Sequence, residues 1–442
     1  MTYNTILEQK ITDRTASVGI IGLGYVGLPL AIAANQKGMM ITGFDVSPKK
    51  LETLRLGESY VEAVSSGDLK SAFATERFTV TDDFTALSQC DVIVICVPTP
   101  LSKYRTPDLS YVENSLEQVA CHVTPGTMVI LESTTYPGTT DEIVVPILSK
   151  SGLTVGADLF VAFSPEREDP GNGSFNTKTI PKIVAGTTPV TTELAAAFYS
   201  QFLTEIVRVA SPAVAEAAKL TENVFRAVNI ALVNELKTIF DRMGIDVWDV
   251  VDAAATKPFG YMPFYPGPGL GGHCIPVDPF YLSWKAREYG MTAQFIELAG
   301  EVNVQMPGYV IGRLRDVLDR SCHVALSQSR LLAVGASYKK NVSDIRESPA
   351  MDIMARLDNA GAVLRCLDPH VDVLDGFQVE TRLQGEPTIA QIDVAGEDFD
   401  AILILTDHDN VDYCALHALG LPIIDTRNAM ARRGITENVY KA

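Results

Sequence analysis

Short apolar runs and helical patterns alternate along residues 16–210. The first run leads into a glycine-rich turn, and the later ones end in Pro, Ser, Thr, Asp or Glu. Strand–helix alternation of this kind predicts a parallel sheet with helices on both faces, and such sheets bind ligands at the carboxyl ends of their strands. The runs that we expect to be strands are SVGIIGLGYVG, MITGFDVS, CDVIVICVPTP, TMVILEST and LFVAFSPE.

The pattern changes at residues 211–257. A Ser-Pro pair at Ser211 begins a stretch with apolar residues at helical spacing, and Gly244 stops it. The predicted helix exceeds the usual length of globular helices, about 8–20 residues, and would serve as a connector or a dimer seam. Residues 258–282 are rich in Gly, Pro and aromatic residues and are expected to form a loop, and a helical stretch follows to about residue 317.

Strand–helix alternation returns in the last part of the chain, with strand ends expected in LLAVGASYKK, AVLRCLDPHV, DAILILTDHD and LPIIDTRN. The sequence therefore predicts an α/β protein with two Rossmann-like, doubly wound parallel-sheet domains joined by a long central helix. We expect an N-terminal domain over residues 1–210, a central helical part over 211–317 and a C-terminal α/β domain over 318–442.

The composition is typical of a multidomain globular protein and argues against some classes of binding partner. The chain has 442 residues, of which 47% are hydrophobic, and its formal net charge is −18. So acidic a chain is a poor candidate for binding nucleic acid or anionic membranes. The sequence contains seven cysteines without a CxxC pair and no apolar run of membrane-spanning length. We therefore expect a cytoplasmic protein with reduced thiols, without a disulfide framework or a metal site.

The first glycine-rich turn has the spacing of a dinucleotide-binding fingerprint, G-x-G-x-x-G. Gly22 permits a tight turn, Gly24 lets the backbone approach a pyrophosphate, and Gly27 lets the helix pack on the strand; Tyr25 and Val26 lie between them. Asp45 ends the next predicted strand, where an acid binds the adenine ribose. An acid there repels a 2′-phosphate, so the cofactor is expected to be NAD.

Two later strand ends are expected to line the nicotinamide half of the same crevice. These are VPTP, with Pro98 and Thr99, and ESTT, with Ser133 and Thr134. On the long helix, Lys219, Asn223 and Arg226 share one face at i, i+4 and i+7. Because the surrounding sequence is apolar, that face is expected to be partly covered.

The stretch GPGLGGHCIPVD contains Cys274, for which three roles are conceivable: a buried inert thiol, a metal ligand or a nucleophile. A buried thiol fits poorly on a loop rich in Gly and Pro. His273 is adjacent instead of spaced as a second ligand, and no second ligand pair is visible. The pattern favours a nucleophile activated by a nearby cation or base.

The fingerprint, the helix KLTENVFRAVNIA, the loop GGHCIPVD and the segment GASYKKNVSDIRESPA together resemble the UDP-glucose/UDP-mannuronate dehydrogenase family of UDP-sugar 6-dehydrogenases. The resemblance covers nearly the whole chain, in the same order. It implies NAD-dependent, four-electron oxidation of a sugar C6 alcohol through a thiohemiacetal and a thioester on the cysteine. It also implies that the C-terminal domain binds the UDP half, with the glycines of the cysteine loop letting backbone approach the sugar.

The resemblance further assigns roles to individual residues. Cys274 would be the nucleophile, Lys219 and Asn223 would stabilise the oxyanion and place the water, and Asp278 would assist proton transfer. Thr134 and Glu166 would lie near the reacting carbon. Arg346 would reach substrate and cofactor, in a neighbouring subunit, and Lys339 would help to close the site. The expected substrate contacts are Glu166, Arg167, Lys219, Asn223, Arg226, Tyr265, Gly271, His273, Lys339 and Arg346.

Two departures from the UDP-glucose pattern bear on the substrate. Val277 stands where that branch has a lysine, and SPEREDPGN replaces its longer acidic segment. Both are similar to the branch that acts on UDP-N-acetylhexosamines of bacterial surface-polysaccharide pathways, with the gluco and galacto sugars favoured and the epimer left open. UDP-N-acetylmannosamine and UDP-glucose remain alternatives, as do a one-hydride two-domain dehydrogenase and a non-catalytic nucleotide-sugar sensor. A homodimer or a larger even homo-oligomer is expected.

Overall fold

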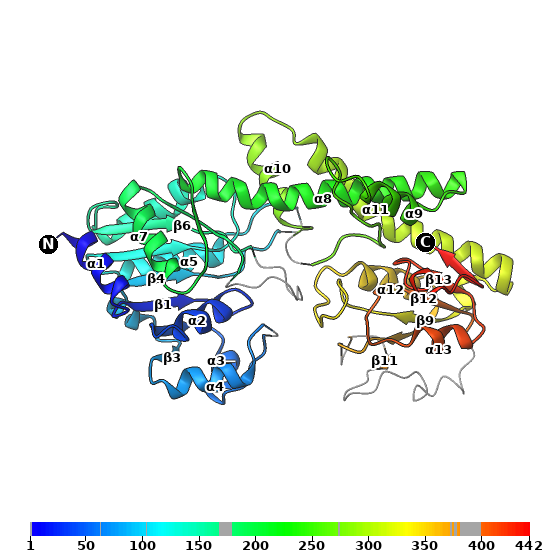
Figure 1. Ribbon diagram of the computed structural model, residues 1–442, viewed down its shortest axis with the longest axis horizontal. Helices are drawn as coiled ribbons and strands as arrows, with labels where there is room; N and C mark the ends of the chain where they lie inside the picture. Colours follow the sequence, from blue (N-terminus) through cyan, green and yellow to red (C-terminus); the bar gives the residue numbers. More distant parts are fainter. Residues whose placement is uncertain are drawn as a thin grey trace. The chain divides into compact units, whose positions relative to one another are not determined.

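The computed structural model describes residues 2–61, 63–102, 104–167, 179–272, 275–371, 374, 378–380 and 399–442. The chain forms two compact units. The first unit contains Met1–Glu222 and Phe280–Met291, and the second contains Asn223–Pro279 and Thr292–Ala442 (Figure 1). Neither unit is therefore a single continuous stretch of the chain.

The first unit is built on one eight-stranded sheet with the order β3-β2-β1-β4-β5-β6-β7-β8. Neighbouring strands are parallel except β6 and β7, which are antiparallel. The strand order reverses between β1 and β4, which is where doubly wound sheets bind ligands. The strands are β1 (Ser17–Ile21), β2 (Met40–Phe44), β3 (Phe78–Thr81), β4 (Val92–Ile95), β5 (Thr127–Leu131), β6 (Leu159–Phe163), β7 (Lys182–Gly186) and β8 (Ile206–Arg208).

Helices cover both faces of this sheet. Val92 and Val94 of β4 face one core, whereas Ile93 and Ile95 face the other, and all four are fully buried. This explains the uninterrupted apolar run, because a parallel strand covered on both sides has no solvent face. One core contains residues of α1 (Tyr3–Thr12), α2 (Gly27–Asn35), α3 (Pro48–Arg55), α4 (Ser66–Ala74) and α7 (Pro189–Ser200), and the other contains residues of α5 (Ser110–His122) and α6 (Val145–Leu148).

The predicted long helix is confirmed as α8 (Pro212–Met243), which begins with a proline in its first turn. It is followed by α9 (Val247–Ala255), α10 (Asp278–Glu288) and α11 (Gln294–Val317). The expected loop over 258–282 is therefore too long at its C-terminal end, because α10 already begins at Asp278. An acid followed by proline is a helix-start signal that the sequence contains at Asp278 and Pro279.

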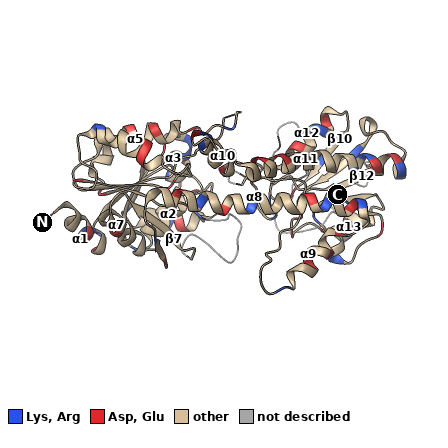
Figure 2. Cartoon of the chain, turned by 90° about the horizontal axis from the view of Figure 1, so that it is seen from above, with Lys and Arg blue, Asp and Glu red and all other residues tan. Residues whose placement is uncertain are grey.

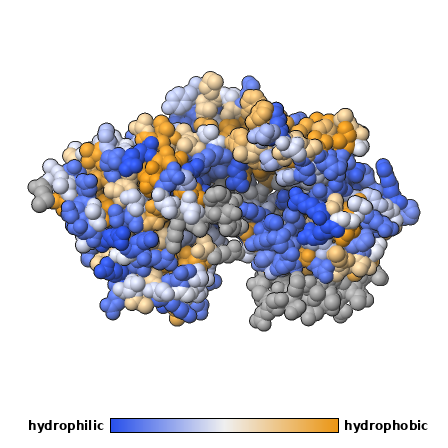
Figure 3. Space-filling model, in the orientation of Figure 1, coloured by the Kyte–Doolittle hydropathy of each residue, from blue (hydrophilic) through white to orange (hydrophobic). Residues whose placement is uncertain are grey.

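One face of α8 carries exposed apolar side chains. Phe225, Leu232 and Ile239 recur every seven residues and are 48%, 49% and 45% exposed, and Met243 extends the row at 62%. Seven residues correspond to about two helical turns, so these side chains share a stripe. Figure 3 shows hydrophobic residues gathered near the end of α8 on the face in view. Acidic and basic residues are interspersed along the same helix (Figure 2).

The second unit contains a six-stranded sheet with the order β11-β10-β9-β12-β13-β14 and parallel neighbours throughout. Leu331 and Ala333 of β9 face one core, and Leu332 and Val334 face the other. The elements are β9 (Arg330–Val334), α12 (Pro349–Asn359), β10 (Val363–Leu367), β11 (Gln378–Glu380), β12 (Ala401–Ile404), α13 (Tyr413–Ala418), β13 (Ile423–Asp425) and β14 (Val439–Lys441).

The predicted fold class is confirmed: an α/β protein with two parallel-sheet, Rossmann-like units and a long helix between them in the chain. Domain boundaries at residues 210 and 317 stay a prediction. Within the described residues, the helices are too short or too polar for any of them to span a membrane.

Candidate active site

The three glycines of the turn after β1 differ in their surroundings. Gly22 has a φ of 91° and lies so close to β4 that a Cβ would approach the Cys96 carbonyl oxygen to 2.7 Å. A Cβ on Gly27 would overlap the carbonyl oxygen of Gly22. A Cβ on Gly24, in contrast, would meet nothing within 4 Å. The outer two glycines thus close the turn, and the middle one leaves backbone accessible to a ligand.

The start of α2 is suited to an anion. Val26 occupies the N-cap position without capping the helix through its side chain, and the first turn contains no acid. Tyr25 is 42% exposed, whereas every residue of α2 is buried. The first backbone N–H groups of a helix have no intrahelical acceptor, and the helix dipole favours negative charge there. These residues fit the pyrophosphate of a dinucleotide.

Asp45 follows β2, beside this turn, and is 6% exposed. Its carboxylate accepts hydrogen bonds from the backbone N–H of Leu23 at 3.1 Å and of Ser47 at 3.0 Å. Lys50 Nζ donates to the same carboxylate at 3.2 Å. The acid is thus fixed beside the glycine turn, as expected of a ribose-binding residue.

The two strand ends of the predicted nicotinamide half lie against each other. Thr99 Oγ1 donates to the Thr134 carbonyl at 2.7 Å, and Ser133 Oγ donates to the Val97 carbonyl at 2.7 Å. Pro98 lies between Val97 and Thr99, the two residues after β4 that make these contacts. Tyr281 of α10 adds a third contact, from its OH to the Thr99 carbonyl at 2.6 Å. The tyrosine was not among the predicted site residues.

A buried polar network supports Glu166 at the end of β6. Lys182 Nζ donates to Glu132 Oε2 and to Glu166 Oε2, both at 3.0 Å, and Tyr199 OH donates to Glu132. The lysine side chain is 5% exposed and that of Glu132 is fully buried. Burial raises the pKa of Glu132, and Lys182 opposes that shift. Burial alone would lower the pKa of Lys182, but the two carboxylates raise it above its ordinary value.

Sequence reasoning missed Lys182 and Tyr199, because they come from β7 and α7, far along the chain from Glu132. The available signal was a charged residue opening an otherwise apolar strand, KIVAG. Arg167, predicted as a substrate contact, forms an ion pair with Glu222 at 2.7 Å and donates to the Pro181 carbonyl at 2.8 Å.

Lys219 and Asn223, predicted as catalytic, are both buried on α8, at 7% and 5% exposure, and Arg226 is half-buried. The Lys219 side chain makes no hydrogen bond or ion pair with another described residue. Asn223 Nδ2 donates to Asp278 Oδ2 at 2.6 Å, and Asp278 is 3% exposed. The structure therefore brings two predicted catalytic residues into direct contact, across α8 and the start of α10.

The glycines before Cys274 pack on the protein's own chain. A Cβ on Gly271 would approach Tyr338 Cβ to 2.6 Å, and the N–H of Gly272 donates to the Arg346 carbonyl at 3.2 Å. The space beside these glycines is thus filled by the segment that carries Lys339 and Arg346. At Gly271 the missing side chain makes room for Tyr338, and the expected approach of a sugar to these glycines stays a prediction.

Two further predicted residues have partners of their own. The Arg346 guanidinium is held by Asp344, with Nε at 2.9 Å and Nη2 at 2.7 Å from its carboxylate. Tyr265 OH donates to Asp252 Oδ1 at 2.6 Å, and that hydrogen bond raises the pKa of the tyrosine. His273 and Cys274 lie outside the described residues, so their predicted roles stay predictions.

Comparison with known proteins identifies the family. Residues 16–203, 213–305 and 332–432 match the NAD binding domain, the central domain and the UDP binding domain of the UDP-glucose/GDP-mannose dehydrogenase family. UDP-N-acetyl-D-glucosamine 6-dehydrogenase of Pseudomonas aeruginosa is 39% identical over 82% of this chain and 85% of its own. The Salmonella typhi protein of that name is 35% identical, over 88% and 89%.

Solved structures give the same result. The UDP-D-ManNAc dehydrogenase of Pyrococcus horikoshii superposes with a TM-score of 0.84 at 31% identity, over 95% of this chain and 96% of its own. The UDP-N-acetyl-mannosamine dehydrogenase Cap5O of Staphylococcus aureus gives 0.81 at 30% identity, over 96% and 98%. With its glycine turn and Asp45 arranged for a dinucleotide, this chain belongs to the UDP-glucose/GDP-mannose dehydrogenase family and is an NAD-dependent oxidoreductase.

Proposed function

We propose that this protein oxidises the C6 alcohol of a UDP-N-acetylhexosamine to the uronic acid. The overall change consumes the alcohol, two NAD⁺ and one water, and gives the carboxylate, two NADH and three protons. Support comes from relatives named UDP-N-acetyl-D-glucosamine 6-dehydrogenase and UDP-N-acetyl-D-mannosamine dehydrogenase. We favour UDP-GlcNAc or UDP-GalNAc, with UDP-ManNAc and UDP-glucose as alternatives.

The observation that carries this proposal is the buried contact between Asn223 and Asp278. Asp278 lies four residues after Cys274 in the sequence, so an acid that can move a proton is tied to the loop that carries the thiol. The amide of Asn223 donates to the acid and holds it as an acceptor. A one-hydride dehydrogenase has no need of a nucleophilic thiol.

The chain's own residues divide the work as follows. Bound NAD supplies the hydride acceptor for both oxidation steps. The Cys274 thiolate adds to the C6 aldehyde, which gives a thiohemiacetal, and oxidation of that adduct gives a thioester. Lys219 stabilises the oxyanion as a buried cation, while Asn223 helps to place the water. Asp278 takes a proton from the water that cleaves the thioester and frees the thiol.

The remaining predicted residues orient the substrate. Glu166 and Thr134 lie at strand ends of the sheet that holds the cofactor, near which the reacting carbon must come. Lys339 and Arg346 lie on the loop after β9, in the part that matches the family's UDP binding domain.

The apolar stripe of α8 supports a homodimer. Light scattering coupled to gel filtration would measure the mass of the assembly.

A substrate panel tests the proposal. The protein is mixed with NAD and, in turn, UDP-GlcNAc, UDP-GalNAc, UDP-ManNAc or UDP-glucose, and the NADH formed per sugar is counted. Two NADH per sugar are expected for the preferred substrate, and one per sugar would point to a one-hydride enzyme. Cys274→Ser should stall this turnover. An absence of NADH with all four sugars would favour a non-catalytic nucleotide-sugar sensor.

A further inference from the structure

The glycine turn of the NAD-binding sheet has a counterpart in the second unit. Gly335 follows β9 as Gly22 follows β1, with φ angles of 85° and 91°. Each glycine donates its N–H at 2.8 Å to the carbonyl of the last residue in the neighbouring strand, Leu367 or Phe44. The two sheets therefore make the same first turn at the point where their strand order reverses.

An aspartate follows the neighbouring strand in both cases. Asp45 accepts the N–H of Leu23, and Asp368 accepts the N–H of Ala336 at 2.7 Å. Each also accepts the backbone N–H of the second residue after itself, at 3.0 Å for Asp45 and 2.8 Å for Asp368. Asp368 is thus the positional equivalent of the acid that we assign to the NAD ribose.

Asp368, however, has no capacity left for a ribose. It is fully buried and accepts five hydrogen bonds, against three for Asp45. A carboxylate offers about four lone-pair positions. Burial alone would raise the pKa of Asp368, but the hydrogen bonds from His408, Ala336 and His370 hold it below its ordinary value. The acid therefore acts as an acceptor within the protein itself.

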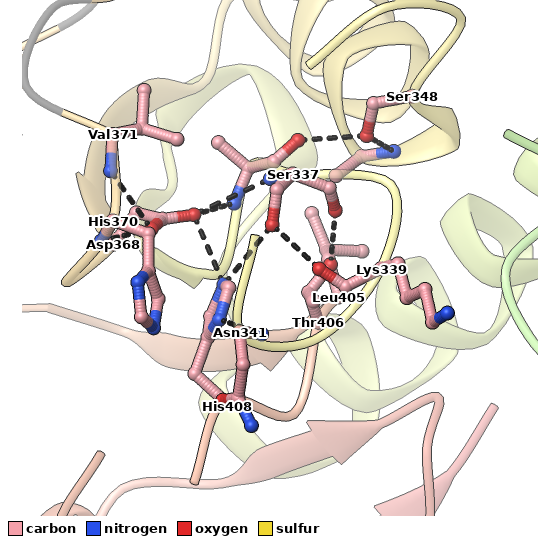
Figure 4. A network of polar contacts seen from close by, with 12 residues as sticks. Ser337, Lys339, Asn341, Ser348, Asp368, His370, Val371, Leu405, Thr406 and His408 are labelled. Carbon is pink, nitrogen blue, oxygen red and sulfur yellow. Dashed lines mark hydrogen bonds and ion pairs between the residues drawn. The ribbon is translucent and has the colours of Figure 1, made fainter. Parts of the chain in front are cut away.

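The side chain that completes this arrangement is His408, which is fully buried. The backbone N–H of Asn341 donates to His408 Nδ1 at 3.0 Å, so that nitrogen carries no proton. The proton lies on Nε2, which is 3.2 Å from Asp368 Oδ2 and 3.2 Å from Ser337 Oγ. Ser337 Oγ gives its own proton to the Lys339 carbonyl at 2.9 Å, so every donor here has an acceptor (Figure 4).

These contacts fix one loop. Residues 336–347, which we call the β9 loop, carry Lys339 and Arg346 and have Asn341 in the left-handed region with a φ of 61°. Asparagine adopts this conformation more readily than most residues, and contacts with its surroundings fix it there. Asn341 is held by His408, and Ser337 accepts a further bond from Thr406 Oγ1 at 2.6 Å. The Lys339 side chain extends away from the histidine (Figure 4).

We infer that Asp368 and His408 are positioning residues that clamp the β9 loop in the conformation that binds the UDP part of the substrate. The inference rests on the proposed function, which assigns Lys339 and Arg346 to that ligand. In the second sheet, the acid at this position bonds to the protein itself and holds the β9 loop in place. Other side chains of that loop then contact the nucleotide. The essential contact is the hydrogen bond from the backbone N–H of Asn341 to the unprotonated Nδ1 of His408.

Two variants of His408 separate this contact from general packing. Asn places an acceptor oxygen near the Nδ1 position, and Gln places a donor near the Nε2 position without that acceptor. His408→Gln should weaken binding of UDP, measured by titration calorimetry, by about tenfold or more, since the Asn341 N–H is left unpaired. His408→Asn should bind UDP within about threefold of the unchanged protein. NAD binding should stay within about threefold in both.

His417→Gln is the matched control, because His417 lies on α13 of the same unit and, among the described residues, its ring bonds only to the Glu437 carbonyl, at 3.1 Å. It should leave UDP and NAD binding unchanged. Unaltered UDP binding in His408→Gln would overturn the inference, and so would equal losses of UDP and NAD binding in both His408 variants. If the unchanged protein binds no UDP and forms no NADH with any UDP-sugar, the proposed function fails; if it does both, only the clamp is in question.

Discussion

Asn223 and Asp278 are joined by a buried hydrogen bond of 2.6 Å between the amide nitrogen and a carboxylate oxygen. The donor comes from the middle of α8, and the acceptor is the first residue of α10. The amide thus contacts the carboxylate that we propose as the proton acceptor in thioester hydrolysis.

Asp278→Asn should therefore interrupt hydrolysis of the thioester while leaving both oxidations possible. We expect kcat to fall by roughly 10²- to 10⁴-fold. A burst of at most two NADH per Cys274 should precede the slow phase, and intact mass measurement of the quenched protein should detect the sugar adduct. Asp249→Asn, an exposed acid on α9, is the control and should keep the unchanged kcat. Full activity of Asp278→Asn would remove the acid from the mechanism.

The glycine turn predicts opposite outcomes for two alanine variants. Gly24→Ala has room for its methyl group, so it should fold normally, but a side chain at the glycine expected to let backbone approach the pyrophosphate should raise KM for NAD about tenfold or more. Gly27→Ala would overlap the Gly22 carbonyl and should lower the free energy of unfolding by about 1–3 kcal/mol or more. Thermal melting and NAD kinetics together check the pair; unchanged NAD kinetics in a well-folded Gly24→Ala would contradict the assignment.

Cofactor choice depends on Asp45. Asp45→Asn retains one oxygen acceptor and removes the charge, so the N–H contacts to Leu23 and Ser47 are partly kept. We expect KM for NAD to rise about tenfold, because hydrogen bonds to charged groups contribute about 1.5–3 kcal/mol. Discrimination against NADP should shrink, because the repulsion of a 2′-phosphate is removed. Binding of UDP, measured by calorimetry, is the internal control and should not change.

The Lys182 network predicts a pH-dependent change in stability. Lys182→Met leaves Glu132 and Glu166 buried without a cation and should lower the free energy of unfolding at pH 8 by about 3–5 kcal/mol. Burial already raises the pKa of Glu132, and loss of the lysine raises it further. A carboxyl with a raised native pKa binds protons more tightly when folded, so the variant regains stability as the pH falls.

The deficit of Lys182→Met should therefore shrink between pH 8 and pH 5, as measured by denaturant unfolding at several pH values. Lys150→Met is the control, because that lysine is 65% exposed and its nearest carboxylate oxygen, on Glu117, is 3.8 Å away. Its effect should stay within about 0.5 kcal/mol at every pH. A deficit of constant size across this range would show that charge burial is not the cause.

Local sequence signals were sufficient for the parts of this protein that are built from neighbouring residues. The turn at Gly22, the acid at Asp45 and the long helix α8 all follow from short-range spacing, and all are present. The start of α10 was placed too late, although Asp278 and Pro279 carry a helix-start signal, because Gly and Pro in the preceding residues favoured a loop.

Contacts between distant segments could not be read in the same way. Lys182 and Glu132 are 50 residues apart, and Asp368 and His408 are 40 apart. In each pair, one residue looks like an ordinary polar strand end, and only strand order places it beside the other. Single-sequence patterns give the strands but not their neighbours, so buried networks between strands lie beyond them.

The return of residues Phe280–Met291 to the first unit has a consequence for the order of synthesis. Tyr281 contacts Thr99, and Lys285 pairs with Glu142 at 2.7 Å, so helix α10 supplies contacts to the first unit from a later part of the chain. A ribosome has completed the last strand of the NAD-binding sheet at residue 208, long before it reaches Tyr281. The nascent sheet therefore lacks the contacts of α10 until Asp278–Glu288 has emerged, so the first unit is completed only after part of the second unit has been made.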